Sequence, residues 1–185
     1  MGKSALVPIA DGIEEIEAVC VIDTLRRAGV TVTVASAGQT QITASRGVKI
    51  VADTTLGGCA GRVFDLIAVP GGMPGAQTLA RSRVLADLLE RQMQAGRWVA
   101  AICAAPVVVL QAHGHLKGLK ATCHPALYAQ MDPALLCREP VVVDRNVVTA
   151  QGPGAAIEFA LTLVEHLVGQ DKRREVAVAM VVPEA

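Results

Sequence analysis

Aromatic residues are scarce in this 185-residue sequence, although hydrophobic residues are abundant. Phe, Trp and Tyr together account for 2% of the chain, whereas hydrophobic residues of all kinds account for 52%. A core with so few rings must be built from Val, Ala, Leu and Ile, which is typical of a parallel sheet covered by helices on both faces. Because the length suits one domain with a substantial core, we expect residues 1–185 to form a single α/β domain.

An excess of charge is also lacking. Lys and Arg number 17, as do Asp and Glu, so the formal net charge is zero. No basic stripe interleaved with aromatic residues occurs, which argues against stable nucleic-acid binding. No apolar run reaches the length of a membrane span, and no secretion signal opens the chain. The sequence therefore predicts a cytoplasmic protein without a membrane partner.

Paired cysteine motifs are missing too. The five cysteines (Cys20, Cys59, Cys103, Cys123 and Cys137) form no CxxC pair, and their number is odd. They indicate neither a disulfide framework nor a zinc site, so we expect reduced thiols. Neither a GxGxxG fingerprint after the first strand nor a GxxxxGK[ST] phosphate loop is present. We therefore expect no metal and no organic cofactor.

The hydrophobic pattern predicts strands and helices that alternate along the chain. Strands are expected at residues 5–10, 30–35, 64–69, 98–102 and 120–123, hairpins at 40–51 and 140–149, and helices at 13–28, 83–94, 106–112, 155–168 and from 171 towards 183. Such alternation gives a mostly parallel sheet with helices on both faces. Sites in these sheets form outside the carboxyl ends of the strands. The loops Asp11-Gly12, Pro70-Gly71-Gly72 and Cys103-Ala104 are expected to converge there.

The apolar run that ends at Cys103 carries the strongest chemical signal. Residues 98–102 are expected to form a buried strand, and Pro106 suits the first turn of a following helix. Cys103 would then lie on a sharp strand-to-helix turn, as in a nucleophile elbow. A nearby helix N-terminus favours the thiolate, so we expect a lowered thiol pKa. A buried, inert core cysteine is the alternative.

Glu17 is the expected partner of that thiol. On the helix predicted over residues 13–28, Glu17 lies in the middle of the apolar stripe. Burial should raise its pKa, and a protonated carboxyl group could donate a hydrogen bond to a thiolate. Glu14 and Glu15, in contrast, fit an ordinary polar helix face.

Two further elements could serve the same site. The Pro70-Gly71-Gly72 loop lacks side chains where a ligand would approach the backbone, and the amides of Gly72 and Ala104 could form an oxyanion hole. His124 follows a predicted strand end and could act as a proton shuttle. Isolated Pro-Gly-Gly turns and loop histidines more often have no such role.

A series of short motifs matches a known family in order along nearly the whole chain. The segments are Ala5-Leu6-Val7, Gly12-Ile13-Glu14-Glu15-Ile16-Glu17, Arg27-Ala28-Gly29, Ser45-Arg46-Gly47, Val69-Pro70-Gly71-Gly72, Ala100-Ala101-Ile102-Cys103-Ala104-Ala105-Pro106 and Gly152-Pro153-Gly154. They resemble the ThiJ/PfpI superfamily, specifically the Parkinsonism-associated deglycase (DJ-one) branch and its bacterial YajL-like relatives.

The resemblance implies a fold, an assembly and a site. The fold would be a flavodoxin-like three-layer sandwich of the class I glutamine amidotransferase-like type, and the assembly a homodimer. We expect its interface at the first helix and at Ser45-Arg46-Gly47. The site would hold a reactive Cys103, hydrogen-bonded to a protonated Glu17, with the Gly72 and Ala104 amides beside it.

Three positions depart from the pattern of the relatives. Ala104 stands where superfamily peptidases have a histidine, so a peptidase would lack its base. Ala44 stands where several relatives have another cysteine, and Gln151 where animal relatives have arginine. A cysteine-dependent peptidase is therefore not expected.

Two functions remain open at this point. The first is a cofactor-independent glyoxalase or deglycase, in which Cys103 attacks methylglyoxal, glyoxal or an early glycation adduct of a protein or nucleotide. The Gly72 and Ala104 amides would stabilise the oxyanion, while Glu17 moves the proton. The second is a redox-sensing protective protein or chaperone, switched by oxidation of Cys103 without metabolic turnover. Both functions require the same thiol.

Overall fold

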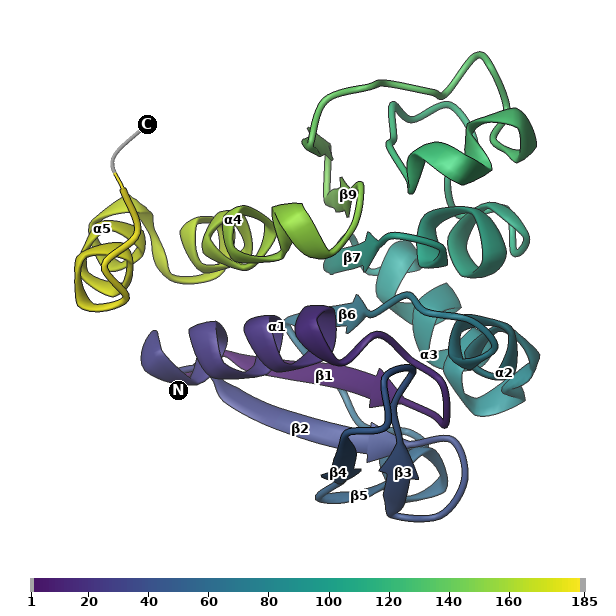
Figure 1. Ribbon diagram of the computed structural model, residues 1–185, viewed down its shortest axis with the longest axis horizontal. Coiled ribbons are helices and arrows are strands. Elements are labelled where there is room, and N and C mark those ends of the chain that lie inside the picture. Colours follow the sequence, from purple (N-terminus) through teal and green to yellow (C-terminus); the bar gives the residue numbers. More distant parts are fainter. Residues whose placement is uncertain (1, 184–185) are drawn as a thin grey trace.

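The computed structural model describes residues 2–183, so the ends of the expected domain, residues 1 and 184–185, lie outside the described residues. In chain order the elements are β1 (Ser4–Ile9), α1 (Glu15–Arg27), β2 (Thr31–Ser36), β3 (Gln41–Thr43), β4 (Lys49–Val51), β5 (Thr54–Thr55), β6 (Leu66–Val69), α2 (Gly75–Arg81), α3 (Arg83–Gln94), β7 (Trp98–Ile102), β8 (Val141–Asp144), β9 (Val147–Ala150), α4 (Ala156–Val168) and α5 (Gln170–Ala179) (Figure 1). Short 3₁₀ segments occupy Leu56–Cys59, Pro125–Gln130 and Pro153–Ala155, and a π-helix occupies Pro106–Gln111.

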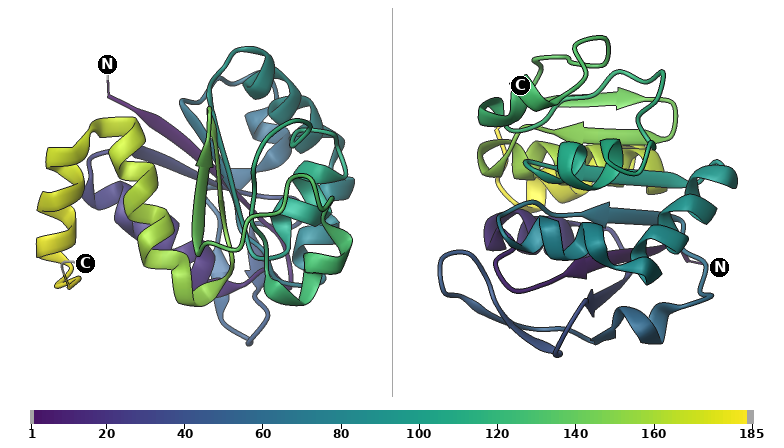
Figure 2. Two further views of the ribbon diagram at one scale, coloured as in Figure 1. Left: turned by 90° about the horizontal axis from the view of Figure 1, so that it is seen from above. Right: turned by 90° about the vertical axis from the view of Figure 1, so that its right-hand side faces the viewer.

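Seven strands form the central sheet in the order β5-β2-β1-β6-β7-β9-β8. Neighbouring strands are parallel except for β8 and β9, which form an antiparallel pair at one edge. Helix α4 packs between α1 and α5 on one face of the sheet, and α2 and α3 cover the other (Figure 2). The expected α/β sandwich with a mostly parallel sheet is confirmed, and it is consistent with a flavodoxin-like fold.

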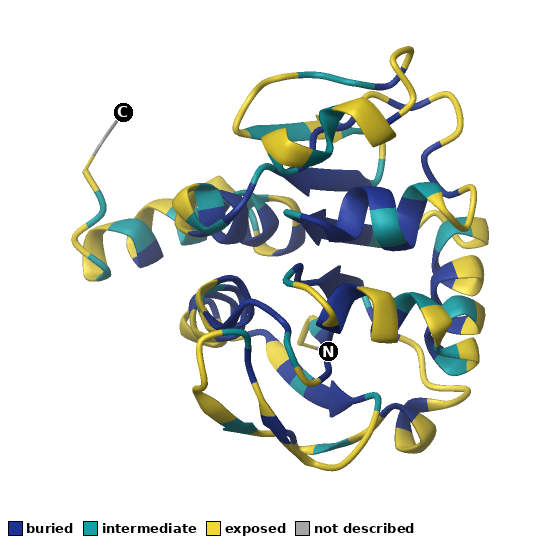
Figure 3. Cartoon of the chain, turned by 45° about the vertical axis from the view of Figure 1, so that its right-hand side comes forward, coloured by how far each residue is buried: buried dark blue, intermediate teal, exposed yellow. Residues whose placement is uncertain are grey.

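The inner strands are apolar on both faces because helices cover both. Leu6 on β1, Ile67 on β6 and Val99 on β7 are completely buried, and the centre of the molecule is correspondingly dark in Figure 3. Side chains that are small or branched at Cβ suit such strands. The two phenylalanines, Phe64 and Phe159, are both buried in this core. The aromatic-poor composition thus reflects a sheet sandwiched between two helical layers.

The structure corrects several expected elements. The strand expected at 120–123 is wrong, since only Ala121 forms an isolated bridge, with Leu136. The helix after the cysteine is a π-helix rather than an α-helix. Helix α2 and strand β5 were not expected, and α1 begins at Glu15 rather than residue 13. In the part of the chain that is described, every helix is too short or too polar to cross a membrane.

Candidate active site

Cys103 lies at the carboxyl end of β7 with its backbone in the left-handed region. Its φ angle is 65°, a conformation that costs a residue other than glycine on the order of 1–3 kcal/mol and persists where the surroundings enforce it. Two hydrogen bonds enforce it here. The Cys103 amide donates to the carbonyl of Ala150 at 2.9 Å, and its carbonyl accepts from the amide of His124 at 2.8 Å. The expected elbow is confirmed.

The three loops predicted to converge do so, and glycine makes their approach possible. A Cβ atom on Gly71 would lie 2.6 Å from the Cys103 Cβ, and one on Gly72 would lie 2.3 Å from the Glu14 nitrogen. No residue other than glycine fits either position without moving backbone. Asp11 has a different role, because its carboxylate accepts from the Thr43 amide at 2.7 Å and thereby holds the β3–β4 hairpin.

Glu17 is completely buried beside the cysteine, as helical periodicity predicted. Its Oε2 accepts a hydrogen bond from the Gly71 amide at 2.8 Å. Its Oε1 accepts no hydrogen bond from the described residues, and the Cys103 thiol lies close enough to influence the pKa of the carboxyl. Burial raises the pKa of Glu17 to about 7, against the lowering effect of the Gly71 and Cys103 hydrogen bonds.

The thiol pKa moves in the direction opposite to the expected one. Burial, followed by the negative charge of Glu17, raises the pKa of Cys103 to about 12, although the amides of Gly72 and Ala104 donate to the sulfur and lower it. The expectation of a lowered thiol pKa is therefore wrong. The physical reason is that the sulfur shares a water-poor site with a carboxylate. The free energy needed to form the Cys103 thiolate is lowest when Glu17 takes the thiol proton, because Glu17 is then neutral and does not repel the charge on the sulfur.

A cavity of about 450 Å³ opens over the half-buried Cys103, and His124 lines it together with Gly72 and Ala104. The structure thus brings together all five residues predicted for the site. His124 is partly committed, because its Nδ1 accepts from the Ala126 amide at 3.2 Å. Only Nε2 is left for proton transfer. The amides of Gly72 and Ala104 lie beside the sulfur, where they favour negative charge on Sγ and lower its pKa.

Comparison with known proteins identifies the family. Residues 3–166 match the model of the DJ-1/PfpI family. The chain belongs to the DJ-1/PfpI family. It is similar to the Glutathione-independent glyoxalase DJR-1.2 of Caenorhabditis elegans, with 38% identity over 173 residues that cover 92% of this chain and 91% of that protein. The bacterial YajL-like subtype stays a prediction.

Two further relatives bear on the fold and on length. The structure of oxidized Toxoplasma gondii DJ-1 superimposes with a TM-score of 0.97 at 41% identity, covering 99% of this chain and 100% of the other. Protein DJ-1 homolog B of Arabidopsis thaliana is 43% identical over 178 residues, which are 96% of this chain but 41% of the plant protein. The chain thus spans less than half the length of that relative.

In this DJ-1/PfpI protein, sequence reasoning missed a second group of polar residues at the cavity. The Ser45 hydroxyl lies 3.0 Å from Glu14 Oε2 and 2.9 Å from Glu15 Oε2, and the Arg46 amide donates to Glu15 Oε1 at 2.9 Å. Glu14 and Glu15 are consequently 9% and 7% exposed, which corrects the expectation of an ordinary polar face.

This arrangement fixes the loop that carries Arg46 to the cavity that contains Cys103. Arg46 is the one Lys or Arg side chain among the described residues that line it. The hairpin signal around Ser45-Arg46-Gly47 was visible in the sequence, but its long-range contact with the first turn of α1 was not. Over residues 2–183 no cluster of three or more His, Cys, Asp or Glu side chains could hold a metal ion.

Proposed function

We propose that this chain is a cysteine-dependent glyoxalase or deglycase that acts on methylglyoxal, glyoxal or early glycation adducts. The observation that carries the proposal is one arrangement: a strained Cys103 whose sulfur faces the buried carboxyl of Glu17 and the amides of Gly72 and Ala104. The name of the Caenorhabditis elegans relative, a glutathione-independent glyoxalase, supports the same chemistry. Protection against carbonyl and oxidative stress would follow from it.

The pKa values suggest how the first bond forms. With a pKa near 7, Glu17 is a carboxylate for part of the time at neutral pH and can take the proton of the much less acidic thiol. The sulfur then adds to the aldehyde carbon, and the aldehyde oxygen receives that proton from Glu17, which gives a hemithioacetal. As charge moves from sulfur to oxygen, the Gly72 and Ala104 amides remain close enough to stabilise it.

The same carboxylate serves the isomerisation. Glu17 removes the proton from the former aldehyde carbon and returns it to the neighbouring carbon, while the hydroxyl proton of the hemithioacetal moves to the ketone oxygen. The hemithioacetal of methylglyoxal thereby becomes a lactoyl thioester on Cys103. Water hydrolyses the thioester to lactate and restores the thiol. His124 could assist this last step through Nε2, since it lies at the cavity mouth.

Lactate formation from methylglyoxal, without glutathione and in the presence of a metal chelator, tests this proposal. Wild-type protein should turn over steadily, and Cys103→Ala should be inactive. Cys137→Ala is the matched control, because Cys137 is half-buried and does not line the cavity around Cys103. Lactate formation by the wild type at the rate of Cys103→Ala would contradict a glyoxalase function.

A redox-sensing role is the second candidate, and the same geometry favours it. Two amides and a carboxyl group converge on one sulfur atom, which suits the oxygen atoms of a sulfinate. The Toxoplasma gondii relative was solved in an oxidized form. Peroxide-dependent protection of a client protein that requires Cys103, in a preparation that makes no lactate, would establish this role instead of the first.

A further inference from the structure

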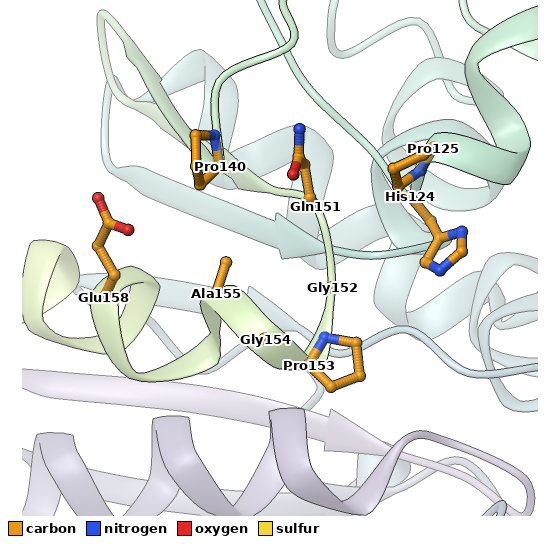
Figure 4. A pocket seen from close by; sticks show the side chains of 9 residues that line it. All are labelled: His124, Pro125, Pro140, Gln151, Gly152, Pro153, Gly154, Ala155 and Glu158. Atoms are coloured by element: carbon orange, nitrogen blue, oxygen red, sulfur yellow. The ribbon is translucent and has the colours of Figure 1, made fainter.

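A second cavity, of about 410 Å³, adjoins the one that contains Cys103. His124 and Pro153 line both cavities, so the two meet at these side chains. Figure 4 shows the second cavity between His124 at one end and Glu158 on α4 at the other. A ligand whose reactive carbon lies at Cys103 and whose remaining part passes His124 would enter it. The proposed reaction on a free dicarbonyl leaves this second space without a role.

The walls of the second cavity are apolar and rigid. Pro125, Pro140 and Pro153 contribute rings, and the remaining wall includes Gly152, Gly154 and Ala155. Proline has no amide hydrogen, so these positions offer no backbone donor to a ligand. An aliphatic stem fits such walls better than a polar one.

Away from His124, whose Nε2 carries a hydrogen because Nδ1 accepts from Ala126, the polar side chains of this cavity accept hydrogen bonds rather than donate them. The side-chain nitrogen of Gln151 is committed, because it donates to the Tyr128 hydroxyl at 2.8 Å and to the Arg138 carbonyl at 2.7 Å. Its backbone nitrogen donates to the Pro140 carbonyl at 3.0 Å. The amide oxygen of Gln151 is thus the group available to a ligand.

Charge in this cavity has one sign. Glu158 is the one Asp, Glu, Lys or Arg side chain among the described residues that line it, and no ion pair within 4.0 Å engages its carboxylate there. Glu158 also lines a neighbouring cavity with Arg173 and Arg174 of α5, and these two arginines pair with Glu165 and Asp171 instead. The cavity around Cys103, by contrast, is lined by residues of both signs, Glu14 and Arg46. The far end of an elongated ligand would therefore meet a carboxylate without a cation among the residues that line this second cavity.

We propose that the second cavity, named here the carrier subsite, binds an aliphatic stem that ends in a cation, such as an ammonium or guanidinium group. The substrates of the site would then be dicarbonyl adducts of molecules that keep a second, unmodified cationic group, with the stem in the carrier subsite and the dicarbonyl carbon at Cys103. This inference rests on the proposed function and narrows its substrate class. Glu158 and the Gln151 oxygen are the groups that select the cation.

Alkylation of Cys103 by tailed haloacetamides tests the subsite without requiring turnover. Reagents with aminoalkyl, alkyl and carboxyalkyl tails of increasing length are compared, and each rate is divided by the rate of the same reagent with a neutral small thiol. At one tail length the aminoalkyl reagent should react about fivefold faster than the alkyl reagent, the scale of a partly exposed ion pair. Equal rates, or a preference independent of tail length, would overturn the subsite.

Two variants and one control variant show which residues cause the preference for a cationic tail. Glu158→Gln should bring the ratio of aminoalkyl to alkyl rates close to one, whereas Asp87→Asn, at an exposed carboxylate on α3, should keep the wild-type ratio. Gly154→Val places a side chain in the subsite, and no atom lies within 4 Å of the added Cβ. This variant should slow all tailed reagents but not untailed iodoacetamide. A ratio that survives Glu158→Gln would refute the role of Glu158 and with it the proposal.

The outcomes for the subsite and for the proposed function can be separated. If the tail preference holds while methylglyoxal is not converted to lactate, the subsite stands and the glyoxalase function fails. If lactate forms but no tail is preferred, the glyoxalase function stands and the carrier subsite fails.

Discussion

The two sides of the first turn of α1 present carboxylates that both have little exposed surface, and their pKa values are shifted in opposite directions. On the hairpin side, burial raises the pKa of Glu15, but hydrogen bonds from the Ser45 hydroxyl and backbone amides outweigh it, so its pKa is lowered. On the cysteine side, Glu17 receives one backbone amide and a thiol, and burial raises its pKa to about 7. Glu17 lies deeper in the protein than Glu15 and receives fewer donors, and both differences separate the two pKa values. Glu15 therefore stays charged and holds the loop of the β3–β4 hairpin, whereas Glu17 can gain and lose a proton beside Cys103.

The largest effect is expected when the cysteine side loses its ionisable group. Glu17→Gln keeps an acceptor for the Gly71 amide but cannot relay a proton, so methylglyoxal turnover should fall by about 10²-fold or more. In the wild type kcat/KM should rise as pH passes through about 7, because the proton acceptor must be a carboxylate. That rise should be missing in Glu17→Gln. An unchanged rate and profile would remove Glu17 from the mechanism.

The same substitution should increase stability above neutral pH. The folded-state pKa of Glu17 lies above its ordinary value of 4.5, so the folded protein retains a proton that the unfolded chain has lost, and the free energy of unfolding falls between pH 4.5 and about 7. Glu17→Gln avoids this cost and should gain about 2 kcal/mol at pH 8, with little gain at pH 4.5. Urea unfolding at both pH values measures it. Equal changes at both would show that ionisation of Glu17 is not the cause.

Substitution of the carboxylate on the hairpin side, Glu15, should have the opposite effect on the free energy of unfolding. Glu15→Gln weakens the charge-assisted bonds to Ser45 and Arg46 and should lower the free energy of unfolding by about 1 kcal/mol at pH 7. Because its pKa is lowered in the folded state, the contribution of Glu15 is complete above its ordinary value and is lost as pH falls through the lower folded value. The wild type and the variant should converge at low pH. A stabilising Glu15→Gln would contradict the comparison.

Substitutions on the solvent-exposed side of the same helix should change the pKa of neither Glu15 nor Glu17. Ile16 and Val19 are 52% and 47% exposed on α1, and Val48 and Val51 are exposed on or beside the β3–β4 hairpin. We propose that these side chains are covered in a homodimer. Light scattering at micromolar concentration should give a dimer mass for the wild type and a monomer mass for Val19→Asp. A wild-type monomer would refute the dimer.

Local patterns in the sequence were sufficient for most strands of the sheet, though not for β5, and for bringing Cys103 and Glu17 to one site. The apolar run before Cys103 and the proline after it indicated the elbow, and helical periodicity placed Glu17 on a buried face. Both predictions depend on neighbours along the chain, which a single sequence displays. Helix α2 was not predicted, because it begins directly after a Gly-Gly-Met-Pro segment that is typical of a turn.

The direction of the thiol pKa could not be predicted in this way. It depends on how closely Cys103 and Glu17 approach across 86 positions of sequence, and that approach is set by the missing side chain of Gly71. The second cavity was invisible for the same reason, since its walls come from the segments around His124, Pro140 and Gln151. The sequence therefore predicted which residues lie at the site, whereas the pKa of the Cys103 thiol depends on tertiary contacts that the sequence does not display.

The different surroundings of two glycines have a consequence for how this protein can change over generations. Gly71 has backbone and side-chain atoms of the elbow within 3 Å of a hypothetical Cβ, whereas Gly154 has none within 4 Å. Random substitution would therefore be eliminated at the first position and tolerated at the second. Substitutions can therefore change the lining of the second cavity while the turn that holds Cys103 stays as it is.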